Sequence, residues 1–138
     1  MARVPLYGGK GLTLLVDTPY ADAYKRHMAY TVNRTVEFAN WLKALADQEA
    51  RSAILARIVR IQSGLLGDFK NLGDKLSEFR VDVGQGYRLY FTMTGREIVL
   101  LLKGGNKRSQ KADIVRAREI IDLLEKARKA AARNAKKK

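Results

Sequence analysis

The apolar and polar positions of this chain first predict two helices joined by a short break. Thr35 is the expected N-cap of the first helix, Asp47 marks the break, and the second helix ends before Gly64. Apolar residues recur at helical spacing along one side of each helix: Phe38, Trp41, Leu42 and Leu45 in the first, and Ala50, Ile54, Leu55, Ile58 and Ile61 in the second. The pattern therefore predicts a helical hairpin whose apolar sides cover a sheet.

The pattern then changes to the alternation that is typical of half-buried strands. Strands are predicted at 76–83 and 87–92, joined by a glycine-containing turn. The run 97–103 is apolar on both faces, as in a central strand, and Gly104-Gly105 is expected to end it. A further short strand is predicted at 29–33, before the first helix. The expected fold class is α+β, with a small antiparallel sheet between the helical hairpin and a C-terminal helix.

The long final helix is predicted from an apolar stripe formed by Ile114, Ala117, Ile121 and Leu124. Beyond Lys126 only alanine, asparagine and cations follow, so the helix is expected to fray there. The chain thus divides into a weakly structured leader over 1–27, one domain over 28–125, and a basic tail over 126–138.

Composition narrows the class of protein. The chain has 138 residues, no cysteine and a formal net charge of +13. Without cysteine, disulfides and thiolate metal sites are excluded, and a cytoplasmic protein is expected. No segment reaches the roughly 20 apolar residues of a membrane span. Seven of the cations lie in the last thirteen residues, where they form either a solvated tail or a sequence-independent contact to RNA.

Within residues 28–125, the excess of positive charge falls in the region of the predicted strands. Alternation places Arg80 and Arg88 on the sheet face away from Phe79 and Leu89, with Tyr90 beside them. The other cations around the sheet are Lys70, Lys103, Lys107 and Arg108. Such a group suits a phosphodiester, because cations neutralise phosphate oxygens and a tyrosine ring stacks on a base. The alternative is a solvated face with ion pairs to Glu78 and Asp82.

Two sequence motifs resemble the RelE/HigB toxins of bacterial toxin–antitoxin modules, in the branch called phage Gp49-like or addiction-module killer proteins. The motifs are LSEFR followed by GQGYRLYF, and LLKGGNKRSQKADI. The resemblance extends from about Met28 to Leu124. It implies a small sheet flanked by helices, ribosome-dependent cleavage of mRNA, and inhibition by a cognate antitoxin of the helix-turn-helix type.

The resemblance also implies roles for individual residues. Arg80 and Arg88 match the family's strand arginines and are expected to clamp phosphate. Lys107 and Arg108 match its basic loop, and with Lys103 they are expected to contact RNA. Many relatives carry a tyrosine or histidine just beyond this loop, whereas this chain has Ser109 and Gln110.

The chemistry of metal-free RNA cleavage needs a base for the 2′-hydroxyl, an acid for the leaving oxygen, and cations on the developing charge. The single histidine, His27, lies in the leader, so a two-histidine mechanism is excluded and no cofactor is expected. Lys70 is the candidate base or charge stabiliser, because neighbouring cations depress the pKa of a lysine. Tyr90 either stacks on a base or packs in the sheet. Gln110 either caps the final helix or contacts RNA.

Two other classes of function remain open at this point. ParE-like proteins share the fold that the resemblance implies but inhibit DNA gyrase without cutting RNA, and a fold alone does not decide function. A non-catalytic protein that binds RNA or the ribosome would account equally well for the charge. The basic pair and the basic loop favour the ribonuclease.

Overall fold

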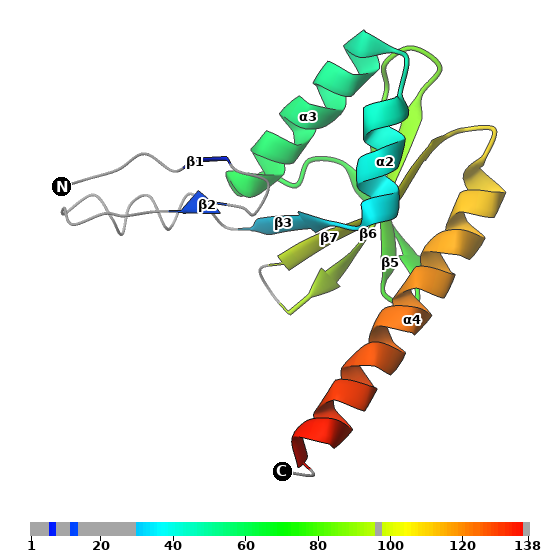
Figure 1. Cartoon of the computed structure of the whole chain (residues 1–138). Coiled ribbons are helices and arrows are strands. Elements are labelled where there is room, and N and C mark those ends of the chain that lie inside the picture. Colours follow the sequence, from blue (N-terminus) through cyan, green and yellow to red (C-terminus); the bar gives the residue numbers. More distant parts are fainter. Residues whose placement is uncertain (1–5, 8–11, 14–29, 96–97, 137–138) are drawn as a thin grey trace, which may run out of the picture.

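The computed structural model describes residues 6–7, 12–13, 30–95 and 98–136. They form an α+β fold, which confirms the predicted class, with two helices before most of the sheet and one after it (Figure 1). The elements are β1 (Leu6–Tyr7), β2 (Leu12–Thr13), β3 (Thr31–Arg34), α2 (Val36–Ala44), α3 (Gln48–Gln62), β4 (Phe69–Gly73), β5 (Leu76–Val81), β6 (Tyr87–Thr94), β7 (Ile98–Asn106) and α4 (Gln110–Lys136). His27 and most of the predicted leader lie outside the described residues.

The main sheet has five strands in the order β3-β7-β6-β5-β4. Neighbouring strands are antiparallel except for β3, which pairs in parallel with β7. The expectation of a purely antiparallel sheet is corrected at this edge. A parallel pair needs a long crossover connection, and here two helices and three strands separate β3 from β7. The predicted strand before the first helix is confirmed as β3.

The predicted N-cap of the first helix is confirmed at Thr35, and Asp47, predicted as the break between the helices, caps the second. The Thr35 hydroxyl accepts a hydrogen bond from the Phe38 amide at 3.0 Å and donates one to the Leu102 carbonyl at 2.8 Å, which ties the start of α2 to β7. Asp47 Oδ1 accepts from the Ala50 amide at 3.0 Å and caps α3. Each cap satisfies a backbone donor that the first turn of a helix leaves unpaired.

Strand β4 was not predicted from the sequence. It is an edge strand whose residues are mostly exposed, so it lacks the apolar alternation that identifies a half-buried strand. A two-residue turn at Asp74 and Lys75, both with positive φ, joins it to β5. The pairing of β4 with β5 contains an irregularity between Asn71 and Gly73. The segment that carries Lys70 is therefore part of the sheet.

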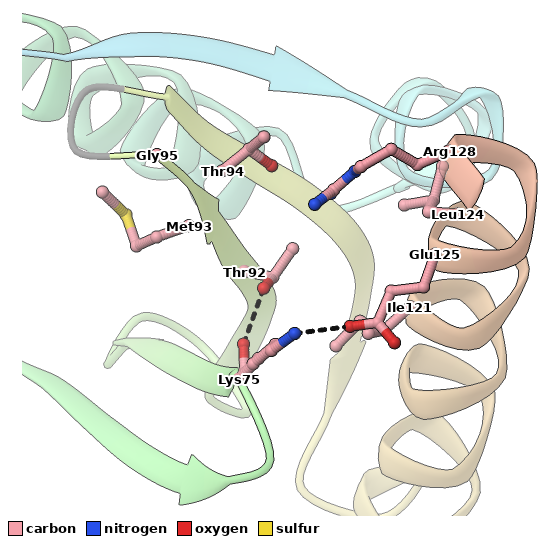
Figure 2. Close-up of a pocket in the computed structure, with 9 residues that line it drawn as sticks. All are labelled: Lys75, Thr92, Met93, Thr94, Gly95, Ile121, Leu124, Glu125 and Arg128. Atoms are coloured by element: carbon pink, nitrogen blue, oxygen red, sulfur yellow. Dashed lines mark hydrogen bonds and ion pairs between the residues drawn. The ribbon is translucent and has the colours of Figure 1, made fainter. Parts of the chain in front are cut away.

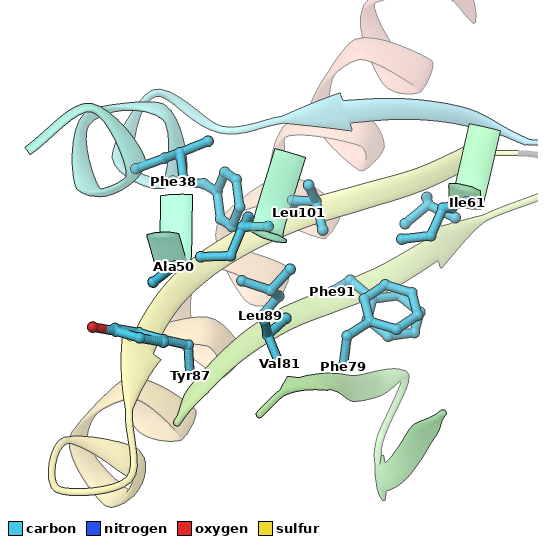
Figure 3. Close-up of a cluster of buried hydrophobic side chains, with 12 residues drawn as sticks. Phe38, Ala50, Ile61, Phe79, Val81, Tyr87, Leu89, Phe91 and Leu101 are labelled. Atoms are coloured by element: carbon cyan, nitrogen blue, oxygen red, sulfur yellow. The ribbon is translucent and has the colours of Figure 1, made fainter. Parts of the chain in front are cut away.

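Two hydrophobic clusters lie on opposite faces of the sheet. The larger one packs under α2 and α3 and includes a stacked pair, Phe79 and Phe91, with ring centroids 3.9 Å apart (Figure 3). The smaller one packs under α4 and contains Leu76, Tyr90, Leu102, Ala117, Ile120 and Ile121. The sheet therefore lies between the hairpin and α4 as predicted, and the face that carries Arg80 and Arg88 holds a second core under α4.

Strand β7 continues through Gly104 and Gly105 to Asn106, although the two glycines were expected to end it. A Cβ atom at Gly104 would overlap the Trp41 ring, and one at Gly105 would overlap the Asp113 carboxylate. The glycines are therefore needed where α2 and α4 approach the two faces of one strand, rather than for a turn.

Helix α4 is longer than predicted and remains helical to Lys136, beyond the expected fraying point at Lys126. Its buried residues include Ala117 and Ile121 of the predicted stripe, whereas Leu124 is 37% exposed. In the described part of the chain, no helix combines the length and apolarity needed to cross a membrane.

Candidate functional site

Arg80 and Arg88 lie directly opposite each other on β5 and β6, so the two side chains share one sheet face as predicted. Glu78 lies on the same face, two residues before Arg80. Its Oε1 is 3.4 Å from Arg80 Nε and 3.5 Å from Arg88 Nη1. One carboxylate therefore holds two guanidinium groups, and the group keeps a net positive charge.

The three residues differ strongly in burial. The side chain of Glu78 is 1% exposed, that of Arg88 12% and that of Arg80 47%. Glu78 Oε2 and Arg88 Nε and Nη1 are buried without a hydrogen-bond partner, so the contact between Arg88 and Glu78 is an ion pair without a hydrogen bond. Buried polar atoms without a partner are costly. Arg80 is the arginine that a ligand reaches from solvent, and Arg88 lies deeper.

Lys70 joins this group from β4. It pairs with Glu78 across β4 and β5, so it belongs to the same face, and it is exposed. A surface pocket is lined by Asp68, Phe69, Lys70, Arg80 and Asp82. The structure thus brings Lys70 and Arg80 to one opening, with two carboxylates at its margin.

A buried arginine that sequence reasoning did not single out holds the segment leading to this pocket. Arg57 of α3 donates hydrogen bonds to the Asp68 carbonyl at 2.6 Å and to the Leu66 carbonyl at 3.0 Å. Its guanidinium also lies over the Phe79 ring, 5.1 Å from the centroid. Ala50, Ile54 and Ile61 lie at i−7, i−3 and i+4 from Arg57, so helical spacing was the signal in the sequence that this cation points inward.

Tyr90 does not offer a ring to a base in this structure. The residue is fully buried under α4, so the expectation of an exposed stacking face is wrong and the packing alternative holds. Burial raises the pKa of the Tyr90 hydroxyl, and the nearby carboxylates of Glu78 and Asp113 raise it further. This hydroxyl is buried without a hydrogen-bond partner.

Lys103 lies on the same sheet face, opposite Tyr90, and its ammonium group is paired with two carboxylates. Its Nζ is 3.5 Å from Glu37 Oε2 and 3.7 Å from Asp113 Oδ1. It therefore bridges α2, β7 and α4. This position favours a role in the fold over the expected contact to RNA.

The basic loop after β7 exposes Lys107 and Arg108. Asn106 Oδ1 orders the loop by accepting hydrogen bonds from the amides of Arg108 and Ser109, at 2.9 and 3.1 Å. The Lys107 side chain lies against Gly86 in the turn between β5 and β6. The loop thus borders the turn that follows Arg80 and precedes Arg88. Gln110 is the first residue of α4 and is half-buried.

The chemistry that this arrangement supports is the binding of an anion with dispersed charge. Guanidinium groups match phosphate oxygens geometrically, and a buried carboxylate that holds them in place preorganises the contact. Among the described residues, no three side chains of the metal-binding types His, Cys, Asp and Glu cluster together.

The face of Glu78 was predicted correctly from the sequence, but its burial was not. Alternation puts it on the face of Arg80, where it was expected only as a surface ion-pair partner. Its side chain is nonetheless only 1% exposed, on the face whose apolar cluster joins β5, β6 and β7 to α4. The contact between these elements has no local signal in the sequence.

Comparison with known proteins shows the family to which the chain belongs. The family model described as phage-derived protein Gp49-like matches residues 40–125, from within α2 to the middle of α4. An uncharacterized protein of Haemophilus influenzae is 41% identical over 97 residues, which cover 70% of this chain and 98% of that protein. The match includes the strands that carry both arginines, and the chain belongs to the Gp49-like family of phage-derived proteins.

Proposed function

We propose that this protein is the toxin of a type II toxin–antitoxin module, of the RelE/HigB superfamily, and that it cleaves mRNA on translating ribosomes. The observation that carries the proposal is the group of Arg80, Arg88 and Glu78, with Lys70 at the same opening. Membership of the Gp49-like family supports a toxin. The substrate that fits the group is the phosphodiester of a single RNA strand.

The burial of each cation suggests its role. Arg80 is exposed enough to contact the scissile phosphate directly, and Arg88 stabilises the developing negative charge from beneath. Lys70 is placed to act as base or as a further charge on the phosphate. Glu78 orients both arginines. Lys107 and Arg108 extend the contact along the RNA, at the turn between β5 and β6.

The experiment that tests the proposal maps new 5′ ends on a reporter transcript after induction of the protein. Cleavage within the translated frame is expected for the natural chain. For Arg80→Ala we expect a rate lower by roughly 10²–10³, the usual cost of losing one transition-state contact. Arg34→Ala, which removes an exposed arginine on the opposite edge strand, is the matched control and should cleave normally.

Two results would contradict the ribonuclease. Intact mRNA together with gyrase-dependent DNA damage would assign the protein to the ParE-like alternative. Growth arrest with ribosome binding but no cleavage would assign it to non-catalytic binding.

The proposal includes a partner. A cognate antitoxin, of the helix-turn-helix type, would neutralise the toxin in the cytoplasm, where translating ribosomes are found. A small helix-turn-helix gene beside this one, whose product restores growth and co-purifies with the chain, is the expected result. Restored growth without a complex would contradict direct inhibition.

A further inference from the structure

The last turns of α4 carry a stripe of cations on one side. Lys126, Lys129, Arg133 and Lys136 follow one another at spacings of three, four and three residues. At 3.6 residues per turn, the four side chains lie within about 80° of the helix circumference. All four are exposed, and none forms an ion pair with a described residue. We name these four residues the basic stripe.

The helix that bears the basic stripe extends away from the domain. The buried residues of α4 end at Ile121, and its last ion pair to the sheet joins Glu125 to Lys75 at 2.7 Å (Figure 2). Arg128 still lines the pocket that Figure 2 shows beside Thr94. Beyond this point α4 projects past the sheet to its end at Lys136 (Figure 1). No core contact therefore explains why this segment is helical.

The charges of the stripe repel one another. Lys126 and Lys129 are an i,i+3 pair, Lys129 and Arg133 an i,i+4 pair, and like charges at these spacings destabilise a helix. The helix dipole favours cations near a C-terminus, but this effect is confined to the last turn and covers Arg133 and Lys136 only. Asp122 and Glu125 lie four residues before Lys126 and Lys129 and offset part of this repulsion, so a bound polyanion would relieve mainly the repulsion between Lys129 and Arg133.

The composition of the segment distinguishes between polyanionic partners. From Lys126 to Lys136 the only other residues are alanines and Asn134, apart from Arg128. Protein interfaces depend on large aromatic or aliphatic anchors and are depleted in lysine and alanine. A helix that lies on a membrane needs an apolar face with residues such as leucine or phenylalanine. Neither is present, which leaves the phosphate backbone of a nucleic acid.

We propose that the basic stripe is a second RNA-binding element, which contacts the backbone of duplex RNA without reading its sequence. The choice of RNA over DNA rests on the proposed function. The stripe is separate from the group around Arg80 and takes no part in the chemistry. It would hold the protein on structured RNA, such as that of the ribosome, while the sheet acts on the single strand.

The test measures binding of the full chain to a fluorescent RNA duplex without single-stranded ends, over a series of salt concentrations. Lys129→Gln/Arg133→Gln is compared with Lys43→Gln/Arg60→Gln, which also removes one exposed lysine and one exposed arginine, from the last turns of α2 and α3. Each phosphate contact contributes about one unit to the slope of log affinity against log salt. We expect the slope to fall by about two units in the stripe variant and to stay unchanged in the control.

Three results would overturn the inference. Equal slopes for both variants would make the stripe ordinary surface charge. Tighter binding to a DNA duplex of the same sequence would reject RNA. Tighter binding to poly-glutamate, lost in the stripe variant, would assign the stripe to an acidic protein. Because the assay contains no ribosome and detects no cleavage, failure of the proposed ribonuclease activity would leave its result unchanged.

Discussion

At the scale of single residues, Arg80 and Arg88 show what alternation predicts and what it leaves out. Their shared face followed from the pattern of the two strands and is confirmed by the pairing of β5 with β6. The pattern did not predict that the two arginines differ in burial. This difference arises because α4, which lies far away in the sequence, packs on Tyr90 and Leu102 and covers part of that face. When polar residues are buried in a second core, the strand shows the same alternation of apolar and polar residues as a strand with one solvated face.

This difference in burial predicts different costs of truncation. Arg80→Ala removes a half-exposed cation, so the free energy of unfolding should change by less than about 0.5 kcal/mol. Arg88→Ala removes a mostly buried partner of Glu78 and should cost about 1–3 kcal/mol. Of the two variants, only Arg80→Ala is therefore expected to melt close to the natural chain.

Thermal unfolding of the purified variants measures this prediction, and mRNA cleavage is assayed in parallel. Arg88→Ala/Glu78→Gln is the control, because it also neutralises the buried carboxylate and should regain part of the lost stability. Equal melting temperatures for the two single variants would contradict the described burial.

At the scale of elements, the helices were predicted more accurately than the strands. Caps are local signals, and Thr35 and Asp47 give the starts of α2 and α3 correctly. The edge strand β4 has no apolar alternation, and the end of β7 was placed too early at two glycines that allow close packing. A glycine can end a strand or allow close packing against it, and residues far away in the sequence decide which of the two applies.

The packing of α2 on β7 predicts a non-additive pair of substitutions. Gly104→Ala should destabilise the fold by about 1–3 kcal/mol, because the new methyl group overlaps the Trp41 ring. In the double variant Gly104→Ala/Trp41→Ala the overlap is gone. Its loss of stability, from urea unfolding, should therefore be smaller than the sum of the two single losses. Additive losses would show that α2 moves freely away from the strand.

At the scale of the whole molecule, ion pairs join α2 and α4 across the end of β7. Arg116 Nη2 and Nε donate to Glu37 Oε1 at 2.9 and 3.0 Å, and Lys103 lies 3.5 Å from the same carboxylate. The hydrogen bond from Arg116 lowers the pKa of Glu37, and the charges of Arg116 and Lys103 add to this against the effect of burial. The N-terminal hairpin and the C-terminal helix are thus connected through one carboxylate.

This connection predicts how stability depends on pH. A carboxyl whose folded pKa is depressed contributes its stabilisation fully above its unfolded pKa of about 4.3, and loses it as pH falls through the folded pKa. The stability difference between the natural chain and Glu37→Gln should therefore be constant from neutral pH to about 5 and shrink below about 4. Urea unfolding across this range measures it, with Glu49→Gln, an exposed carboxylate on α3, as the control.

The exposed edge strand β4 has a consequence for self-association. An unpaired edge is a template on which a second copy can add a strand, and natural sheets block such addition with charged residues and irregular pairing. In β4, Lys70 supplies the charge and the irregularity between Asn71 and Gly73 disturbs the regular backbone. Lys70 therefore lies both at the pocket and on the edge strand, where a charge opposes the addition of a further strand. An aliphatic residue in place of Lys70 would remove this charge and leave the edge more open to strand addition and aggregation, whereas Lys70→Gln would keep a polar side chain there.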